Sequence, residues 1–193
     1  MKKFLPALLL IASVSSFADG ITKDTGINYN EIGLSYFSIR ISDKYDFNGY
    51  ATKGSVLLTD NIFIEGTYAN TSAKISSSSY TVTLREANLG YRLPIGTSTD
   101  FFGTIGYSGS TFTGDDDSSG YSVKLGVNSK LTDDLKISGT YKYSNVSNND
   151  PYNTGGLEAQ YYFTKSFHSH IGYYVMGGGA TAKYYDVGIG YSF

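Results

Sequence analysis

The sequence contains no cysteine and no tryptophan, and only 3 of its 193 residues are proline. Without cysteine, the chain can form neither disulfide bonds nor thiolate metal sites. Beyond residue 18 it also lacks an apolar run of the roughly 20 residues that a transmembrane helix requires. A basic face is lacking as well, since 15 basic residues are set against 17 acidic ones. Nucleic acid is therefore not predicted as a partner.

The first 18 residues have the three zones of a secretory signal peptide. Two lysines follow the initiator methionine, an apolar run extends from 4 to 12, and the sequence Ser-Phe-Ala ends at position 18. The alternative is a membrane anchor helix, which would need a longer apolar run. We predict a signal peptide over 1–18 and one exported domain over 19–193. Without the two lysines, 13 basic and 17 acidic residues give this domain a net charge of −4.

Apolar residues recur at every second position through most of the remaining chain. This is the period of a β-strand that has one apolar face. The last such segment places Tyr185, Val187, Ile189, Tyr191 and Phe193 at alternate positions. We count ten segments of about 9 to 12 residues, a length that suits tilted strands crossing a membrane. Eight strands is the alternative, if a weak early segment is a loop.

The connections between these segments alternate in character. One set consists of tight turns, such as those at 59–61, 132–134 and 164–166. The other set is polar and longer, and it covers about 41–50, 71–80, 111–120, 146–155 and 177–183. Outer-membrane barrels combine short periplasmic turns with longer outer loops. An even number of strands would then place both termini on the periplasmic side.

The face opposite to the apolar set distinguishes a membrane barrel from a soluble β-sandwich. In a sandwich that face meets water and is rich in charge. Here it is mostly small, and it includes Gly33, Ser35, Gly90, Gly106, Ser122, Gly126, Ser138, Thr140, Gly172, Gly188 and Gly190. Small residues suit the concave interior of a narrow barrel. We therefore predict an all-β fold, a transmembrane antiparallel up-and-down β-barrel, over a secreted soluble β domain.

The last nine residues, from Tyr185 to Phe193, resemble the terminal strand of bacterial outer-membrane proteins. In that family an alternating strand with a C-terminal aromatic residue is read by the barrel-assembly machinery, which would make Tyr191 and Phe193 an assembly signal. The segments 31–36, 58–68 and 87–93 are similar to the small outer-membrane barrels of the OmpA and OmpX type. That superfamily also contains the group regulated by a diffusible signal factor. The resemblance implies the fold and a location in the outer membrane, and it supplies no catalytic residues.

Charged residues on the small face are the candidates for a functional site. We predict a charge network inside the barrel made of Glu65, Glu86, Lys124, Lys142, Glu158 and Asp186. Lys130 and Lys136 are expected on the same face. If the hairpin near position 150 is symmetric, Lys142 lies directly across from Glu158. A structural network is favoured over a selective passage, because side chains fill a small barrel.

The two histidines, His168 and His170, share the inward face of one strand. The sequence offers no obvious third ligand or paired carboxylate, so we predict no metal site. The His–Ser pair of lipid A deacylases faces the lipid with a spacing of two residues, which His168-Ser169-His170 does not match. We predict no catalytic residues and no cofactor.

Taken together, the sequence predicts a monomeric outer-membrane barrel with a structural or interaction role at the cell surface. The alternative is a narrow channel for ions or small solutes, and a lipid-modifying enzyme is a third, less favoured hypothesis. The expected partners are outer-membrane lipids, lipopolysaccharide and, during assembly, the barrel-assembly machinery. No individual ligand or host target is identified.

Overall fold

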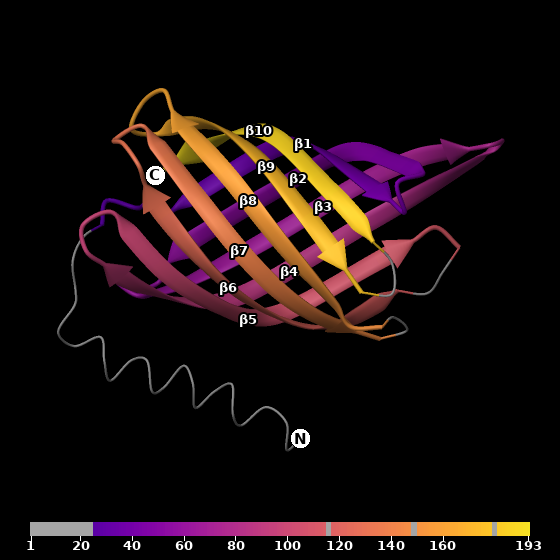
Figure 1. Ribbon diagram of the computed structural model, residues 1–193, viewed down its shortest axis with the longest axis horizontal. Coiled ribbons are helices and arrows are strands. Elements are labelled where there is room, and N and C mark those ends of the chain that lie inside the picture. The colour runs from indigo at the N-terminus through magenta and orange to yellow at the C-terminus, as the bar shows by residue number, and fades with distance from the viewer. Residues whose placement is uncertain (1–24, 115–116, 148–149, 179–180) are drawn as a thin grey trace, which may run out of the picture.

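The computed structural model describes residues 25–114, 117–147, 150–178 and 181–193, so the predicted signal peptide lies outside it. All regular structure in these residues is β (Figure 1). The strands are β1 (Glu31–Ile41), β2 (Tyr45–Leu57), β3 (Ile62–Ile75), β4 (Ser78–Ile95), β5 (Thr99–Phe112), β6 (Ser118–Lys130), β7 (Leu135–Val146), β8 (Tyr152–Tyr162), β9 (Phe167–Gly177) and β10 (Ala182–Ser192). Within the described ranges, no helix has the length and apolar character needed to cross a membrane.

Each strand pairs antiparallel with the next along the chain, and β1 also pairs with β10. Glu31 at the start of β1 lies opposite Ser192 on one side and Ser55 on the other. The sheet is therefore a closed barrel of ten strands, which confirms the predicted up-and-down fold and excludes eight. Closure leaves no free strand edge, so backbone groups can be paired throughout a hydrocarbon layer.

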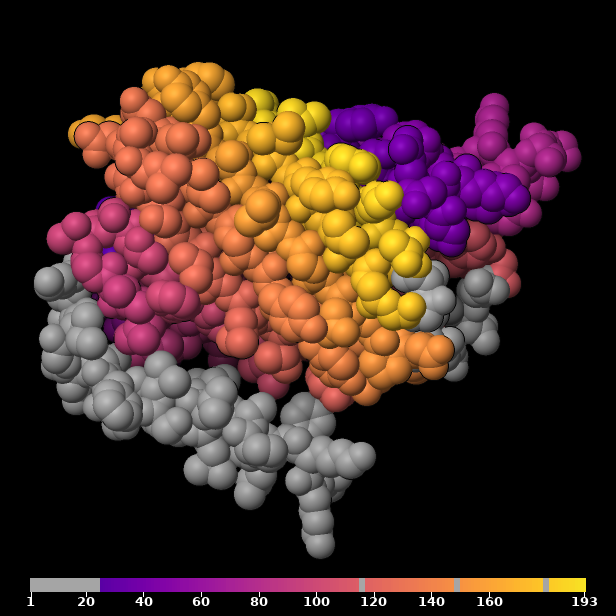
Figure 2. All heavy atoms as spheres, viewed as in Figure 1, coloured from indigo at the N-terminus to yellow at the C-terminus, as the bar shows by residue number. Residues whose placement is uncertain are grey.

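The barrel has two ends, which we name by the chain. The terminal rim carries the start of β1 and the end of β10, and the far rim carries the β1–β2 and β3–β4 turns (Figure 1). The β3–β4 hairpin extends past the rest of the far rim, where Figure 2 shows its tip standing clear of the other strands. In the same view, side chains of β7 to β10 form a continuous outer wall on the face turned toward the reader.

Side chains alternate between the outer wall and the lumen, as the sequence predicts. In β10, Val187 and Ile189 face outward and are 53% and 64% exposed, whereas Asp186 and Gly190, which flank them, are buried. Aromatic residues near the two ends also face outward, including Phe101, Phe163, Phe167 and Tyr191 toward the terminal rim and Tyr68, Tyr107 and Tyr185 toward the far rim. The outer wall is therefore apolar with aromatic residues at both ends, the pattern of a surface surrounded by lipid.

The predicted difference in connection length is wrong. The β1–β2 connection has only residues 42–44 and the β3–β4 connection only 76–77, where the sequence predicted loops over 41–50 and 71–80. Serine and threonine residues at 71–72 and 78–79 lie in the predicted loop, yet they form rungs between β3 and β4. The composition of these residues does not predict a strand, but each is paired with a residue on the adjacent strand. The strands therefore extend well into the expected far-rim loops.

Large inward side chains occupy part of the lumen, which the sequence analysis did not anticipate. Phe63 and Phe102 point inward and lie against Gly90 and Gly126 on the neighbouring strands. A Cβ atom at Gly90 would lie 2.3 Å from Phe63 Cζ, and one at Gly126 would lie 2.4 Å from Phe102 Cζ. Some of the small inward residues thus make room for aromatic rings, rather than only fitting a narrow barrel.

Apolar residues gather inside the barrel at both ends. The terminal cluster consists of Ile27, Tyr29, Phe63 and Phe102, with Leu57 packed against it. The far cluster has the buried members Ile39, Phe47, Val82 and Ala182, and side chains such as Phe112, Met176 and Tyr184 pack against it. Between the two clusters the lumen is polar and charged.

Candidate functional site

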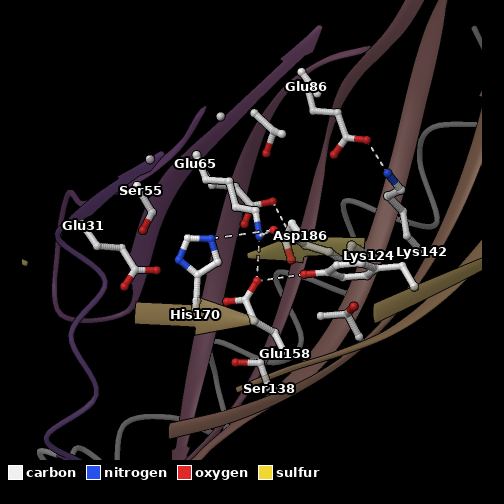
Figure 3. A pocket seen from close by; sticks show the side chains of 18 of the residues that line it. Glu31, Ser55, Glu65, Glu86, Lys124, Ser138, Lys142, Glu158, His170 and Asp186 are labelled. Atoms are coloured by element: carbon white, nitrogen blue, oxygen red, sulfur yellow. Dashed lines mark hydrogen bonds and ion pairs between the residues drawn. The ribbon is translucent and has the colours of Figure 1, made fainter. Parts of the chain in front are cut away.

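The candidate site is the charged middle of the lumen. A cavity of about 270 Å³ lies there, with Tyr29 and Phe63 of the terminal cluster on one side and Phe37 and Tyr184 beside the far cluster on the other. Lysine and carboxylate side chains from opposite walls reach into it (Figure 3). Each lysine that reaches this cavity is paired with at least one carboxylate.

Lys53 on β2 is at the centre of the largest group of contacts. Its Nζ lies 2.7 Å from Glu158 Oε2 on β8, and it also forms an ion pair with Asp186 on β10. Tyr174 donates a hydrogen bond of 2.8 Å to Glu158 Oε2, and Gln160 donates one of 3.0 Å to Glu158 Oε1. Buried charges persist when they are paired and hydrogen-bonded in this way.

Three further ion pairs cross the lumen. Lys124 on β6 pairs with Glu65 on β3, and Asn88 donates a hydrogen bond of 3.0 Å to the same Glu65 oxygen. Lys142 on β7 pairs with Glu86 on β4. Lys136 on β7 lies 3.5 Å from Glu31 on β1.

These pairs join strands that are far apart around the barrel. β2 and β8 are separated by four steps (β2-β1-β10-β9-β8), and β3 and β6 by three, in a ring where five is the maximum. The pairs therefore tie opposite walls together across the lumen, rather than linking neighbours within the sheet. Because the paired side chains span the lumen, they obstruct its cross-section. Unpaired lysines or carboxylates along one wall would leave it open.

The structure brings all six residues of the predicted network into ion pairs, but not in the one specific pairing that the sequence predicted. Lys142 does not lie across from Glu158. Its neighbour on β8 is Thr154, and Glu158 lies opposite Ser138. The β7–β8 hairpin is centred near 148 rather than 150, which displaces every pair by four positions. Lys142 contacts Glu86 instead, and Glu158 contacts Lys53. A functional role for this network stays a prediction.

Sequence reasoning missed three members of the network, namely Glu31, Lys53 and Tyr174. A signal for Lys53 was present, because it is three residues from the outward Val56 and therefore on the inward face of β2. Tyr174 has the opposite parity to Tyr173, which faces outward. Counting parity along every segment would have found both. Which carboxylate each lysine reaches depends on the barrel's geometry and has no local signal.

His168 and His170 lie inside the lumen as predicted, and both are buried. His170 Nε2 is 3.8 Å from Asp186 Oδ2, a neighbour that the sequence analysis did not recognise. His168 Nδ1, His170 Nε2 and Asp186 Oδ1 are buried and have no hydrogen-bond partner among the described residues. All three side chains line the cavity, so water in this space would supply the missing partners.

A second buried group of charges lies at the terminal rim. Arg92 Nη1 on β4 is 3.2 Å from Asp100 Oδ2 on β5, and Thr25 donates a hydrogen bond of 2.7 Å to the other Asp100 oxygen. Tyr29 packs beside this pair, with the Arg92 guanidinium 5.4 Å from its ring centre. Burial raises the pKa of the Tyr29 phenol, and the nearby Asp100 carboxylate raises it further, so this hydroxyl stays neutral.

Comparisons with known proteins agree with this architecture. The profile of a family described as "Outer membrane protein beta-barrel domain" matches residues 4–163. Among solved structures, the NanC porin aligns with a TM-score of 0.52 at 11% identity, covering 83% of this chain and 100% of that one. The KdgM porin in complex with disordered oligogalacturonate aligns with a TM-score of 0.50 at 12% identity, covering 83% and 99%.

Ail, the attachment invasion locus protein of Yersinia pestis, aligns with a TM-score of 0.40 at 14% identity, covering 84% of this chain and 95% of that one. No curated protein matches the sequence. The two porins share a fold with this chain, and at such low identity the likeness extends to the fold alone.

Proposed function

The chain belongs to the outer membrane protein β-barrel domain family, and from this membership we propose that it is a closed outer-membrane barrel with a structural or interaction role. Its outer wall and its far rim would be the working surfaces, in contact with lipid, lipopolysaccharide and the cell exterior. The lumen would serve to hold the wall in shape. We propose no catalytic residue, cofactor or metal for this role.

One observation carries the proposal: lysine–carboxylate pairs cross the lumen between opposite walls. Lys53–Glu158, Lys124–Glu65 and Lys142–Glu86 each join strands three or four steps apart. Opening a passage would require separating such partners, and leaving a largely buried charge without its partner is costly. Apolar clusters stand at both ends of the same lumen. Together these features support a barrel whose lumen is obstructed by its own side chains.

The second candidate is a narrow channel for ions or small solutes. It is favoured by the cavity of about 270 Å³, whose charged lining would be unusual for a space with no solvent. A channel would need both apolar clusters to part. For this reason we place it second.

Conductance across a planar lipid bilayer separates the two candidates. Purified, refolded protein should give no unitary current steps, while a general porin inserted in the same chamber gives them. Liposome swelling with a small neutral sugar should likewise match protein-free liposomes. Reproducible current steps that disappear when the sample is boiled beforehand would replace the closed barrel with the channel.

We also propose that Tyr191 and Phe193 act as the assembly signal read by the barrel-assembly machinery. Both rings face the outer wall at the terminal rim, with their centroids 6.4 Å apart. Phe193 donates its backbone N–H to the carbonyl of Asn30 at 3.0 Å, next to the seam between β1 and β10.

The closed sheet offers no unpaired strand edge, which supports a monomer.

A further inference from the structure

The apolar clusters at the two mouths of the barrel are built from different parts of the chain. Ile39, Phe47, Val82 and Ala182 of the far cluster all belong to strands of the wall. In the terminal cluster, by contrast, Ile27 and Tyr29 come from the segment that precedes β1. Strand pairing of β1 begins only at Glu31. The terminal mouth thus holds a segment that lies inside the barrel without being part of its sheet.

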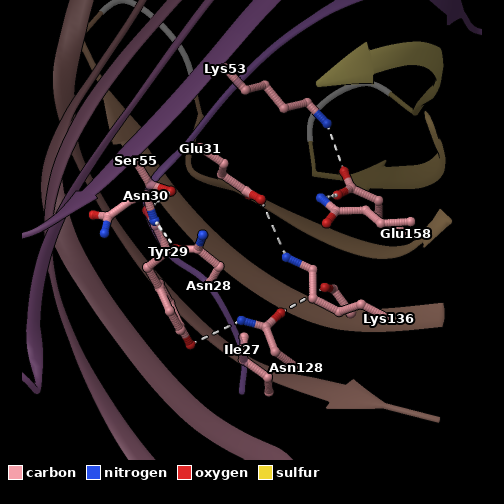
Figure 4. A network of polar contacts seen from close by, with 12 residues as sticks. Ile27, Asn28, Tyr29, Asn30, Glu31, Lys53, Ser55, Asn128, Lys136 and Glu158 are labelled. Carbon is pink, nitrogen blue, oxygen red and sulfur yellow. Dashed lines mark hydrogen bonds and ion pairs between the residues drawn. The ribbon is translucent and has the colours of Figure 1, made fainter. Parts of the chain in front are cut away.

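Residues 25–29, which we call the plug, are held by their side chains and by two of their carbonyl groups (Figure 4). Tyr29 is 5% exposed, and its ring centre lies 4.7 Å from that of Phe63. Asn128 donates a hydrogen bond of 3.0 Å to the Tyr29 hydroxyl, and Ser55 donates one of 2.6 Å to the Tyr29 carbonyl. Ile27 is buried beside them, and its carbonyl accepts a hydrogen bond from Arg92.

The wall keeps its own pairings when these contacts are taken away. Arg92 still has Asp100 at 3.2 Å, and Asn128 still accepts a hydrogen bond of 2.6 Å from Ser138. If the plug left, Arg92 and Asp100 would therefore still have each other as partners. It would expose the rings of Phe63 and Phe102 to water but break no rung of the sheet. Elements with few ladder bonds are the ones that open locally first.

The plug also forms one wall of the cavity. Asn28 and Tyr29 line it on the terminal side, and Lys53, Lys136 and His170 line it deeper in the lumen. Without Asn28 and Tyr29 in place, the cavity would be continuous with the solvent beyond the terminal rim. At the other end, the lumen is lined by the apolar side chains of the far cluster.

We propose that residues 25–29 are a displaceable plug, and that its release turns the lumen into a chamber open only at the terminal rim. This inference rests on the closed lumen proposed above. The chamber would admit small polar or charged molecules from the periplasmic side. Its lysines, carboxylates and imidazoles would offer them hydrogen bonds and ion pairs, while passage through the membrane stayed blocked.

The absence of cysteine allows a direct test with a single reporter thiol. Thr140 lines the cavity from β7, away from the plug, so Thr140→Cys reports access to the chamber. Three proteins carry this reporter. The first has the native plug, and in the second residues 25–29 are replaced by glycine and serine. The third carries Tyr29→Phe, a matched control that keeps the aromatic ring. A charged thiosulfonate reagent is applied to each refolded protein, and the heat-dependent gel shift confirms that each barrel is folded.

We expect the thiol to react at least tenfold faster when the plug is replaced than when it is native, and the Tyr29→Phe protein to react like the native one. If the replacement fails to fold, Tyr29→Ser takes its place, and faster labelling is again expected. Equal, slow labelling in all folded variants would overturn the plug and leave the closed barrel standing. Fast labelling with the native plug would overturn the closed barrel itself. Current steps from the plug-replaced protein would contradict a chamber closed at the far rim.

Discussion

Lys53 and Glu158 face each other across the lumen, with Lys53 Nζ 2.7 Å from Glu158 Oε2, although 105 residues separate them in the chain. Lys53 also contacts Asp186, whose side chain is fully buried. One lysine therefore neutralises carboxylates on β8 and β10 from its position on β2. The stability of this part of the barrel therefore depends on a positive charge from β2, a strand that is paired with neither β8 nor β10.

Replacing this lysine with methionine should be strongly destabilising. Lys53→Met keeps most of the side-chain volume but leaves Glu158 and Asp186 without their shared cation. Loss of one partner of a buried ion pair costs about 3–5 kcal/mol. Urea unfolding in detergent micelles would measure the loss in free energy of unfolding. It can be followed by circular dichroism or by tyrosine fluorescence, since the sequence has no tryptophan. Arg40→Met is the matched control, because its pair with Asp46 is solvent-exposed, and it should have little effect.

A side chain at Gly90 should conflict with Phe63. Because a Cβ atom there would lie 2.3 Å from the ring, Gly90→Val forces the ring or the strand to move. Overpacking of this kind costs about 1–3 kcal/mol in free energy of unfolding. In a Phe63→Ala background the ring is absent, so adding Gly90→Val should lower the free energy of unfolding by less than it does in the native protein. If valine were equally harmful with and without the ring, the contact between them would not explain the glycine.

A charge on the outer wall should be penalised according to its depth. Ile189 faces outward near the middle of β10, so Ile189→Arg would place a guanidinium in hydrocarbon. Such a substitution costs about 2–4 kcal/mol at the bilayer midplane and about 0–1 kcal/mol near the interface. Ser38→Arg, on the outward side of β1 closer to the far rim, is the control. Unfolding of both variants from lipid vesicles gives the comparison, and equal penalties would argue against a lipid-facing wall.

The C-terminal aromatic residue should matter for assembly more than for stability. Phe193→Ser removes an outward ring that is 60% exposed, so little packing is lost. In cells, the amount of protein in the outer membrane should fall, while refolding of the purified variant into detergent should match that of the native chain. Normal amounts in the membrane would remove Phe193 from the proposed assembly signal.

The sequence predicted the features that follow from the two-residue period of a strand. That period assigns each side chain of β10, from Val187 to Ser192, either to the outer wall or to the lumen without any knowledge of its neighbours. Ten segments of adequate length then require a closed sheet in a membrane. Inward positions such as Glu65 and Lys124 could be predicted for the same reason.

What the sequence did not predict depends on register and on distance across the barrel. Lys142 and Glu158 were paired by assuming a hairpin centre, and a shift of that centre by two residues gave each a different partner. The contacts of Lys53 and Lys124 cross the lumen, where strand tilt and stagger decide which side chains meet. The plug was missed because its apolar residues, Ile27 and Tyr29, precede the first strand and have no alternating segment around them.

The central claim is that ion pairs tie opposite walls of the barrel together, and a double-mutant cycle on Lys142 and Glu86 tests it most directly. These side chains pair with each other from β7 and β4, three strands apart. Unfolding free energies of the native protein, Lys142→Met, Glu86→Gln and the double variant give the coupling energy. We predict a favourable coupling of about 0.5–3 kcal/mol, the range for residues in contact. Additive single effects, with no coupling, would contradict the account.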